Sequence, residues 1–425
     1  MTTPLASIVR HARLHAPYYR QLYAHLPESD WQLSDLPLIE PETFWADAAD
    51  IDHWPVLTGP ILDGHVFKTG GSTSEGKLSI YSREEWQQFI HRFGQGLGKQ
   101  LKAGDRVANL FFAGDLYTSF LFIHGSLSHS PVPVCEFPFT GAVDDATLAD
   151  AINQYGITVL ACVPAQLLRF ASWLNQVGRQ LPGIRCILYG GESLFDDQRP
   201  LLDRVFPNAR TASIGCASVD AGLIGASLPD CTSGEHRVFD GDTLVEIIDE
   251  ATGQPITAMN QVGMLVVTNL QRRLMPILRY PTGDLACWRE TVGTPQRKFA
   301  LCGRASQGHR LRVGTLSLFP AEIGKLIAAH AGHTPWQLHL SRSAGVDTLT
   351  LRLADDAGQA LPPRAELQTA LQITLPALAE ALLQGQVIVQ VHYLPSSTLA
   401  THPRSGKLLR IVDERHYLVT QEEMA

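Results

Sequence analysis

The middle of the chain alternates short apolar runs with amphipathic stretches. Several of the runs are apolar on both faces, and segments with helical spacing separate them, a pattern typical of a parallel sheet covered by helices. The pattern therefore predicts an α/β fold with mostly parallel sheets. The predicted strands lie at 106–112, 131–137, 156–164, 184–191 and 209–215.

The residues that precede this core in the sequence follow a different pattern. Residues 5–24 have near-helical apolar spacing and predict an opening helix broken at Pro17. Two short strands are predicted at 65–69 and 77–81, and Ser82 with Glu85 forms a capping box that begins the next helix. A β-rich part follows the parallel sheet, with a hairpin predicted over 242–256 and a strand over 263–270.

Beyond Arg304 the pattern predicts a small domain of α-β-β-α-β order, about the ~100 residues that such a domain needs. We therefore predict a large domain at 1–304 and a small α+β domain at 305–425, joined by a hinge. The predicted elements of the small domain are a helix over 320–330, strands over 336–342 and 347–354, a helix over 364–384 and a strand over 386–394.

Composition narrows the classes of function. The 425 residues are 45% hydrophobic and carry a net charge of 34 − 42 = −8, which excludes a disordered chain and disfavours nucleic acid as the main partner. No run approaches the ~18 apolar residues of a membrane span. The seven cysteines form no C-x-x-C pair, and the N-terminus lacks the apolar run of a secretion signal, so we expect a cytoplasmic protein with reduced thiols. A monomer and a homodimer both remain open.

A loop rich in glycine and hydroxyl groups separates the two predicted strands at 65–69 and 77–81. It runs TGGSTSEGK and supplies backbone donors, hydroxyl donors and one lysine, which suit phosphate binding. It departs from the Walker pattern, because Leu78 stands where a serine or threonine belongs and no helix follows. A surface hairpin is the alternative. The candidate phosphate-binding residues are Thr69, Gly70, Gly71, Ser72, Thr73 and Lys77.

Three further segments could contact a ligand. Gly190, Gly191 and Glu192 follow a predicted buried strand, where α/β sheets bind their ligands, and the segment 213–218 ends the next strand. Asp284 follows a glycine at the end of an apolar strand, where a carboxylate can accept hydrogen bonds from a ribose diol. Ordinary βα turns and a capped turn are the alternatives.

Seven motifs occur together in order along nearly the whole chain. They are TGGSTSEGK, YGGESL, SIGCAS, PILRYPTGDL, the Gly-Arg pair at 303–304, FPAEI and PRSGK. In this order and spacing they resemble the adenylate-forming superfamily of acyl-CoA synthetases, peptide-synthetase adenylation domains and luciferases. The opening HAPYYRQLY and the stretch GEHRVF look most like its phenylacetate-CoA ligase branch.

The resemblance implies roles for individual residues. The glycine-rich loop would hold the β- and γ-phosphates of ATP, and Gly190, Gly191 and Glu192 would form the adenine side. Asp284 and Arg304 would contact the ribose. Lys407, in PRSGK, would be the catalytic lysine that the small domain brings to the carboxylate and the α-phosphate. Without the resemblance, Lys407 would be an ordinary surface lysine.

Departures from the family pattern cluster at the metal site and the hinge. Ser218 stands where the family has a magnesium-binding glutamate, and a hydroxyl binds Mg²⁺ far more weakly than a carboxylate does. Asp220 or Glu192 could substitute, so Ser218 and Asp220 are the candidate metal residues. Ala305, Ser306 and Gln307 replace acidic hinge residues, and Gly324 replaces a glutamate.

We therefore expect an AMP-forming ligase that uses Mg²⁺-ATP to activate a carboxylic acid and transfers the acyl group to coenzyme A or to a carrier-protein phosphopantetheine arm. The acid is expected to be aromatic or otherwise apolar. The alternatives are a degenerate scaffold that binds acid, nucleotide or a partner protein without turnover and, more distantly, a phosphotransferase. The candidate acid-binding residues are Cys216, Ala217, Ala221 and Gly222, with Phe137, Phe139 and Trp288 as further candidates.

Overall fold

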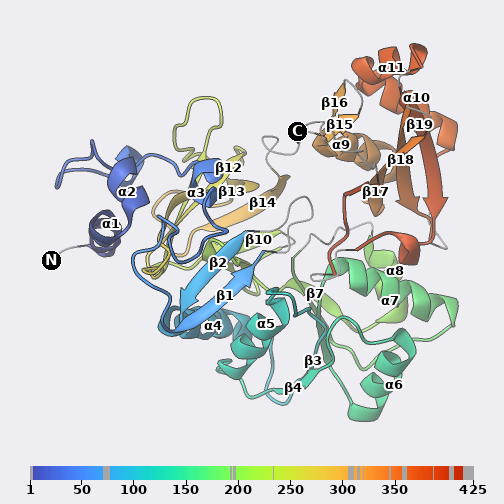
Figure 1. The fold of residues 1–425 in the computed structure, drawn as a ribbon. Helices are drawn as coiled ribbons and strands as arrows, with labels where there is room; N and C mark the ends of the chain where they lie inside the picture. Colours follow the sequence, from blue (N-terminus) through green and yellow to red (C-terminus); the bar gives the residue numbers. More distant parts are fainter. Residues whose placement is uncertain are drawn as a thin grey trace, which may run out of the picture.

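The computed structural model describes residues 3–69, 77–191, 194, 198–232, 234–304, 311–313, 316–318, 320–343, 346–356, 361–385, 387–401 and 406–414. Figure 1 shows a large body, coloured blue to yellow, and a separate orange and red C-terminal body beside it. The predicted domain boundary lies between residues 304 and 305, and residues 305–310 lie outside the described residues. The position of the boundary therefore stays a prediction.

A five-stranded sheet forms the centre of the large body. All its strands run parallel, in the order β4-β3-β5-β6-β7, which confirms the predicted parallel sheet. Each strand has four residues and is shorter than predicted, because the apolar runs extend into the loops that precede and follow the strands. The strands are β3 (Arg106–Asn109), β4 (Cys135–Pro138), β5 (Val159–Cys162), β6 (Cys186–Tyr189) and β7 (Arg210–Ser213).

Helices cover both faces of this sheet (Figure 1). β5 and β6 are buried along their whole length, as strands covered on both faces must be. One apolar core lies on each side of the sheet. The helices are α4 (Arg83–Leu97), η2 (Gly98–Gln100), α5 (Ser119–Ser128), α6 (Asp145–Tyr155), α7 (Pro164–Gln176) and α8 (Arg199–Val205).

The predicted β-rich part is a seven-stranded sheet in the order β11-β12-β13-β14-β10-β9-β8. The hairpin expected over 242–256 is reduced to a tight turn with the single bridge Ile248–Pro255, because β11 pairs along its whole length with β12. The strands are β8 (Cys216–Ser218), β9 (Gly222–Ala226), β10 (Glu235–Val238), β11 (Thr243–Ile248), β12 (Gly263–Asn269), β13 (Ile277–Trp288) and β14 (Lys298–Arg304).

The N-terminal segment packs on the seven-stranded sheet. The predicted break at Pro17 is confirmed, since one helix ends at His15 and Pro17 begins the next, where its missing N–H needs no partner. The capping box is also present: Ser82 N–H donates to Glu85 Oε2 at 2.8 Å, and Glu85 N–H donates to Ser82 Oγ at 3.2 Å. The elements are α1 (Pro4–His15), α2 (Pro17–Leu22), η1 (Leu33–Asp35), α3 (Pro41–Trp45), β1 (Gly64–Lys68) and β2 (Leu78–Ser82).

The C-terminal body has its own apolar core and a four-stranded sheet in the order β19-β18-β17-β20. The single helix expected over 364–384 is two helices that meet at Leu375, because Pro376 disfavours helical geometry in the residue before it. The elements are β15 (Leu311–Val313), β16 (Leu316–Leu318), α9 (Pro320–Ala331), β17 (Trp336–Ser343), β18 (Val346–Ala354), α10 (Arg364–Thr374), α11 (Pro376–Leu383), β19 (Val387–Leu394), η4 (Ser396–Thr398) and β20 (Ile411–Asp413). Within the described residues, no helix is both long and apolar enough to cross a membrane.

Candidate active site at the edge of the parallel sheet

Two glycines follow β6 at the carboxyl edge of the parallel sheet. Gly190 N–H donates to the Cys162 carbonyl at 3.1 Å, and a Cβ on Gly190 would lie only 2.6 Å from Ile214 Cγ2. Gly191 has a φ of +82°, which favours glycine. The segment therefore offers bare backbone at the edge where α/β sheets bind their ligands. Glu192 lies outside the described residues.

Lys407 reaches this edge from the C-terminal body. A Cβ on Gly191 would lie 2.9 Å from Lys407 Cε and 3.6 Å from Lys407 Nζ. The lysine and the glycine are 216 positions apart in the sequence, yet their atoms are in contact. The structure thus brings together two residues for which the resemblance implies roles at one nucleotide.

The loop that carries Lys407 is fixed at its base. Thr401 and Leu408 form an antiparallel bridge, and Leu409 N–H donates to the Ala400 carbonyl at 3.0 Å. The fully buried Gln337 donates from Nε2 to the carbonyls of Ala400 at 3.0 Å and Leu409 at 2.7 Å. The base of the loop therefore moves with the C-terminal sheet.

A hydrogen-bonded chain that the sequence did not predict begins at Lys77. Lys77 Nζ donates to Tyr280 Oη at 2.8 Å, and Tyr280 Oη donates to Asp220 Oδ2 at 2.7 Å. Thr69 steadies the lysine backbone, because Lys77 N–H donates to Thr69 Oγ1 at 2.9 Å. The intervening Gly70, Gly71, Ser72 and Thr73 lie outside the described residues, so their predicted phosphate contacts stay predictions.

Electrostatics favour a charged Asp220 inside this chain. Burial raises the pKa of the carboxyl, but the Lys77 charge and the hydrogen bonds from Tyr280, Ser218 and the backbone together outweigh it, so the net shift of the Asp220 pKa is downward. Lys77 Nζ also lies 5.5 Å from the ring centre of Trp45 and 5.4 Å from that of Tyr280, within the range of cation–π attraction. Asp220, Tyr280 and Trp45 thus hold the charge of Lys77 at the end of the predicted phosphate loop.

This arrangement does not suit Asp220 and Ser218 as magnesium ligands. Asp220 Oδ2 accepts from Tyr280 Oη, and Asp220 Oδ1 accepts from Ala221 N–H at 3.1 Å. Ser218 Oγ accepts from the same N–H at 3.0 Å. A cation approaching Asp220 would also meet the Lys77 charge. In the part of the chain that the structure describes, no three His, Cys, Asp or Glu side chains form a metal-binding cluster. Asp220 fits better as the counter-ion of Lys77.

Arg272 fixes the backbone of Asp220, and sequence reasoning missed it. This arginine is 2% exposed and donates to the carbonyls of Asp220 at 2.8 Å and Ile80 at 2.7 Å. Its guanidinium carbon lies 3.8 Å from the ring centre of Tyr81. A buried arginine of this kind orders the β8–β9 turn, and no local sequence signal marks it.

The predicted ribose pair lies on adjacent strands. Asp284 is opposite Arg304 in the antiparallel register of β13 and β14. The expectation that Asp284 ends a strand is wrong, because β13 continues to Trp288; the irregularity is instead at Gly283, with a φ of +80°. Asp284 is half-buried, and its N–H donates to Thr282 Oγ1 at 3.2 Å. The side chain of Arg304 is not described.

The predicted acid-binding residues lie where the two sheets join. The segment at 216–218 is the edge strand β8, not a loop ending the parallel sheet as expected. Cys216 and Ala217 are half-buried, and Ala221 is fully buried. Gly222 is packed so closely that a Cβ would lie 2.4 Å from Asn269 Nδ2. Ala217 and Cys216 are therefore the members of this set that a ligand can reach most easily.

The three aromatic candidates do not form one slot. Phe137 and Phe139 pack on the core of the parallel sheet, whereas Trp288 belongs to the core of the seven-stranded sheet. Trp288 Nε1–H donates to the Ile256 carbonyl at 3.0 Å. All three serve the cores of their own sheets, the usual place for aromatic residues in an α/β protein.

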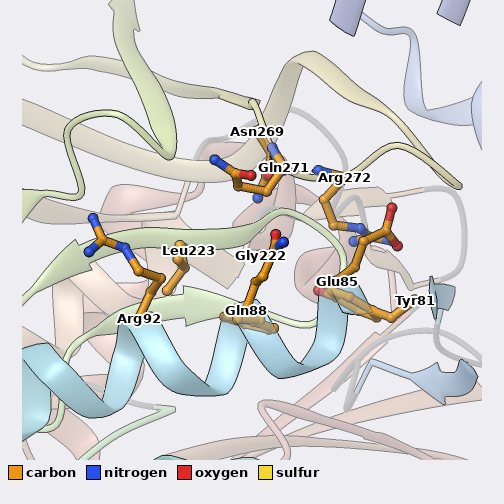
Figure 2. A pocket seen from close by; sticks show the side chains of 10 residues that line it. Tyr81, Glu85, Gln88, Arg92, Gly222, Leu223, Asn269, Gln271 and Arg272 are labelled. Carbon is orange, nitrogen blue, oxygen red and sulfur yellow. Dashed lines mark hydrogen bonds between the residues drawn. The ribbon is translucent and has the colours of Figure 1, made fainter. Parts of the chain in front are cut away.

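A separate small pocket lies over α4 (Figure 2). Figure 2 shows Glu85 and Gln88 rising from the helix toward Arg272 and Gln271, with Arg92 one turn further along the helix. Its volume of about 20 Å³ has room for a water molecule and not for an acyl-adenylate. It therefore does not compete with the edge of the parallel sheet as the candidate site.

The comparisons with known proteins agree with this fold. No family model matches the chain. Phenylacetate-coenzyme A ligase of Thermus thermophilus is 24% identical over 366 residues, covering 82% of this chain and 79% of that protein. The protein of the same name from Escherichia coli strain K12 is 22% identical over 370 residues, covering 83% and 81%. A crystal structure of 2-hydroxyisobutyryl-CoA ligase in the postadenylation state, in complex with 2-HIB-AMP, superposes with a TM-score of 0.70 at 18% identity, over 97% of this chain and 88% of the other.

The chain shares its fold with this ligase, and its ordered motifs resemble those of the adenylate-forming superfamily. Within it, the sequence likeness confirms the predicted resemblance to the phenylacetate-CoA ligase branch.

Proposed function

We propose that the protein is an ATP-dependent acid–thiol ligase. The carboxylate oxygen of an acid attacks the α-phosphorus of ATP, pyrophosphate leaves, and a thiol then displaces AMP from the acyl-adenylate to give a thioester. ATP enters as its magnesium complex, which is a substrate. The observation that carries the proposal is the contact of Lys407 with Gly191 at the carboxyl end of β6.

In the proposed first half-reaction, each described residue has one task. Lys77, held by Tyr280 and Asp220, binds the terminal phosphates through its charge. Gly190 and Gly191 let the nucleotide approach the backbone, and Asp284 binds the ribose hydroxyls. Lys407 stabilises the negative charge that develops between the carboxylate and the α-phosphate.

For the second half-reaction we propose coenzyme A as the thiol. The names of the relatives support this choice, because the curated matches are phenylacetate-coenzyme A ligases. A carrier-protein phosphopantetheine arm presents the same thiol and is the alternative acceptor. Rotation of the C-terminal body about residues 304–308 would exchange Lys407 for the thiol-transfer arrangement.

The proposed acid is aromatic or otherwise apolar. The support is the named substrate of the relatives and the small, half-buried side chains of Cys216 and Ala217 at the junction of the sheets. Small side chains leave space for a flat ring, and the apolar environment favours it.

Pyrophosphate release tests the proposal. The protein is incubated with Mg²⁺-ATP, coenzyme A and a panel of acids that begins with phenylacetate. Acid-dependent pyrophosphate is expected from the natural chain, and Lys407→Ala is expected to lower it by at least 100-fold. Lys325→Ala is the matched control, because Lys325 is an exposed lysine of the same body on α9. No acid-dependent pyrophosphate from the natural chain would overturn the proposal.

One observation favours a second candidate, a scaffold that binds ATP and acid without turnover. Ser218 replaces the family glutamate, and the buried Asp220 is engaged with Tyr280. This candidate predicts saturable ATP binding with no pyrophosphate from any variant. A phosphotransferase is disfavoured, because the loop before Lys77 joins the antiparallel strands β1 and β2 and precedes no helix that could bind phosphate at its N-terminus.

A further inference from the structure

We infer that Phe112 is a positioning residue: its ring is the surface of the large body on which the Lys407 loop docks. The consequence for catalysis rests on the proposed ligase function, whereas the contact itself does not. Phe112 belongs to none of the motifs that carry the family resemblance, and it lies in the loop after β3.

Gly406 packs directly against this ring. A Cβ on Gly406 would lie 2.0 Å from Phe112 Cε2 and 2.3 Å from Cζ. Gly141 contacts the same edge of the ring, since a Cβ there would lie 2.1 Å from Cζ and 2.2 Å from Cε2. Neither position has room for a side chain, so glycine at both sites allows the ring and the loop to meet.

The backbone around Phe112 is firmly held. Phe112 N–H donates to Ser119 Oγ at 3.2 Å, and its carbonyl accepts from Ser119 Oγ at 3.0 Å and from Phe120 N–H at 2.8 Å. Gly141 N–H donates to the Phe111 carbonyl at 2.9 Å, and Gln166 Nε2 donates to the Gly141 carbonyl at 3.1 Å. The ring therefore projects from a rigid edge of the parallel sheet.

The loop side of the contact is equally specific. Gly406 is buried and has a φ of +66°, so both its conformation and its surroundings require glycine. It directly precedes Lys407, and Gln337 fixes the base of the loop two residues further on. Docking of Gly406 on Phe112 therefore sets where the Lys407 side chain begins, and Lys407 then extends over Gly191.

This contact joins two bodies, so it stabilises one arrangement of them. A second contact at the same interface is the hydrogen bond from Gln198 Nε2 to the His333 carbonyl at 3.0 Å. When the C-terminal body rotates for thiol transfer, the contact between Gly406 and Phe112 must break. Its loss should therefore impair the half-reaction that needs Lys407 and spare the other. A misplacement of about 1 Å can cost about 100-fold in rate.

The test separates the two half-reactions in Phe112→Ala, Gly406→Ala and the conservative Phe112→Tyr. Adenylation is followed by ATP–pyrophosphate exchange with phenylacetate, and thiol transfer by AMP release from synthetic phenylacetyl-adenylate with coenzyme A. We expect Phe112→Ala and Gly406→Ala to lower exchange by about 10-fold to 100-fold and to change thiol transfer by less than about 2-fold. Phe112→Tyr should lower ATP–pyrophosphate exchange as well, because its hydroxyl on Cζ would crowd Gly141 and Gly406. Equal losses in both half-reactions would overturn the inference.

Hydrogen exchange of backbone amides gives a readout that needs no turnover. In Gly406→Ala we expect faster exchange both at residues 407–409 and at residues 111–113, with exchange of β17 and β18 unchanged. Unchanged exchange at residues 111–113 would overturn the docking contact. If the natural chain makes no adenylate from any acid, the ligase proposal fails. The hydrogen-exchange measurement then decides by itself whether Gly406 docks on Phe112.

Discussion

The side chain of Lys407 lies over Gly191, so that a methyl group at Gly191 would be 2.9 Å from Lys407 Cε. The lysine belongs to the C-terminal body, and the glycine follows β6 at the carboxyl edge of the parallel sheet. The two bodies are thus arranged with the predicted catalytic lysine at the predicted nucleotide site.

Substitution of Gly191 tests this contact. Gly191→Ala should lower acid-dependent pyrophosphate release by about 10-fold or more, because the methyl group would displace Lys407. Its φ of +82° adds backbone strain of about 1 kcal/mol. Gly178→Ala is the matched control, because Gly178 has a φ of +66° and no neighbouring atom within 4 Å of its Cβ position. An equal loss of activity in both variants would mean that strain alone is responsible.

Removal of the Tyr280 hydroxyl tests the chain that holds Lys77. Tyr280→Phe should raise the KM for ATP by about 5-fold, because a hydrogen bond worth about 1 kcal/mol no longer positions the lysine. Measured over a range of ATP concentrations, kcat should change less than KM. Tyr23→Phe is the control, because the buried hydroxyl of Tyr23 has no hydrogen-bond partner among the described residues. An unchanged KM in Tyr280→Phe would show that the chain does not serve ATP binding.

His236 makes stability depend on pH. Burial lowers the pKa of His236 to about 4, from 6.5, so the unfolded chain binds a proton that the folded chain does not. Its contribution to stability is therefore full above pH 6.5 and is lost as the pH falls toward 4, by about 3 kcal/mol. Between pH 7 and pH 4, the free energy of unfolding of the natural chain should fall, and that of His236→Gln should fall by about 3 kcal/mol less. Both free energies are measured by unfolding in urea.

The His236 measurement needs a control at an exposed histidine. His25→Gln, at an exposed histidine, should keep the pH dependence of the natural chain. The same slope in His236→Gln as in the natural chain would contradict burial as the cause.

Enlargement of Ala217 tests the proposed acid site. Ala217→Leu should exclude bulky acids and leave small ones active, because the half-buried side chain lies at the junction of the two sheets. ATP binding, measured by calorimetry without acid, should be unchanged. The same order of preference across the acid panel would remove Ala217 from the acid site.

Local patterns predicted the fold well where local physics decides it. The parallel sheet, the break at Pro17 and the capping box of Ser82 and Glu85 are all present. The hairpin predicted over 242–256 is only a turn with the bridge Ile248–Pro255, and the prediction of a single helix over 364–384 was wrong. In the first case β12 pairs with β11 over a longer register, and in the second Pro376 interrupts the helix.

The candidate site likewise combines residues that sequence motifs predict with residues that only tertiary packing brings together. The approach of Lys407 to Gly191 could be anticipated, because both lie in motifs of the family. The chain from Lys77 through Tyr280 to Asp220 could not, because its bonded members are 203 and 60 positions apart and meet only through tertiary packing. Arg272 and Phe112 likewise have no local signature.

The most direct test of the account is mass spectrometry of the nucleotide products formed from Mg²⁺-ATP and a pool of aromatic and aliphatic acids, with hydroxylamine present to trap activated acyl groups. We expect AMP together with the hydroxamate of one apolar acid from the natural chain, and neither product from Lys407→Ala. Intact ATP, or ADP in place of AMP, from the natural chain would contradict it.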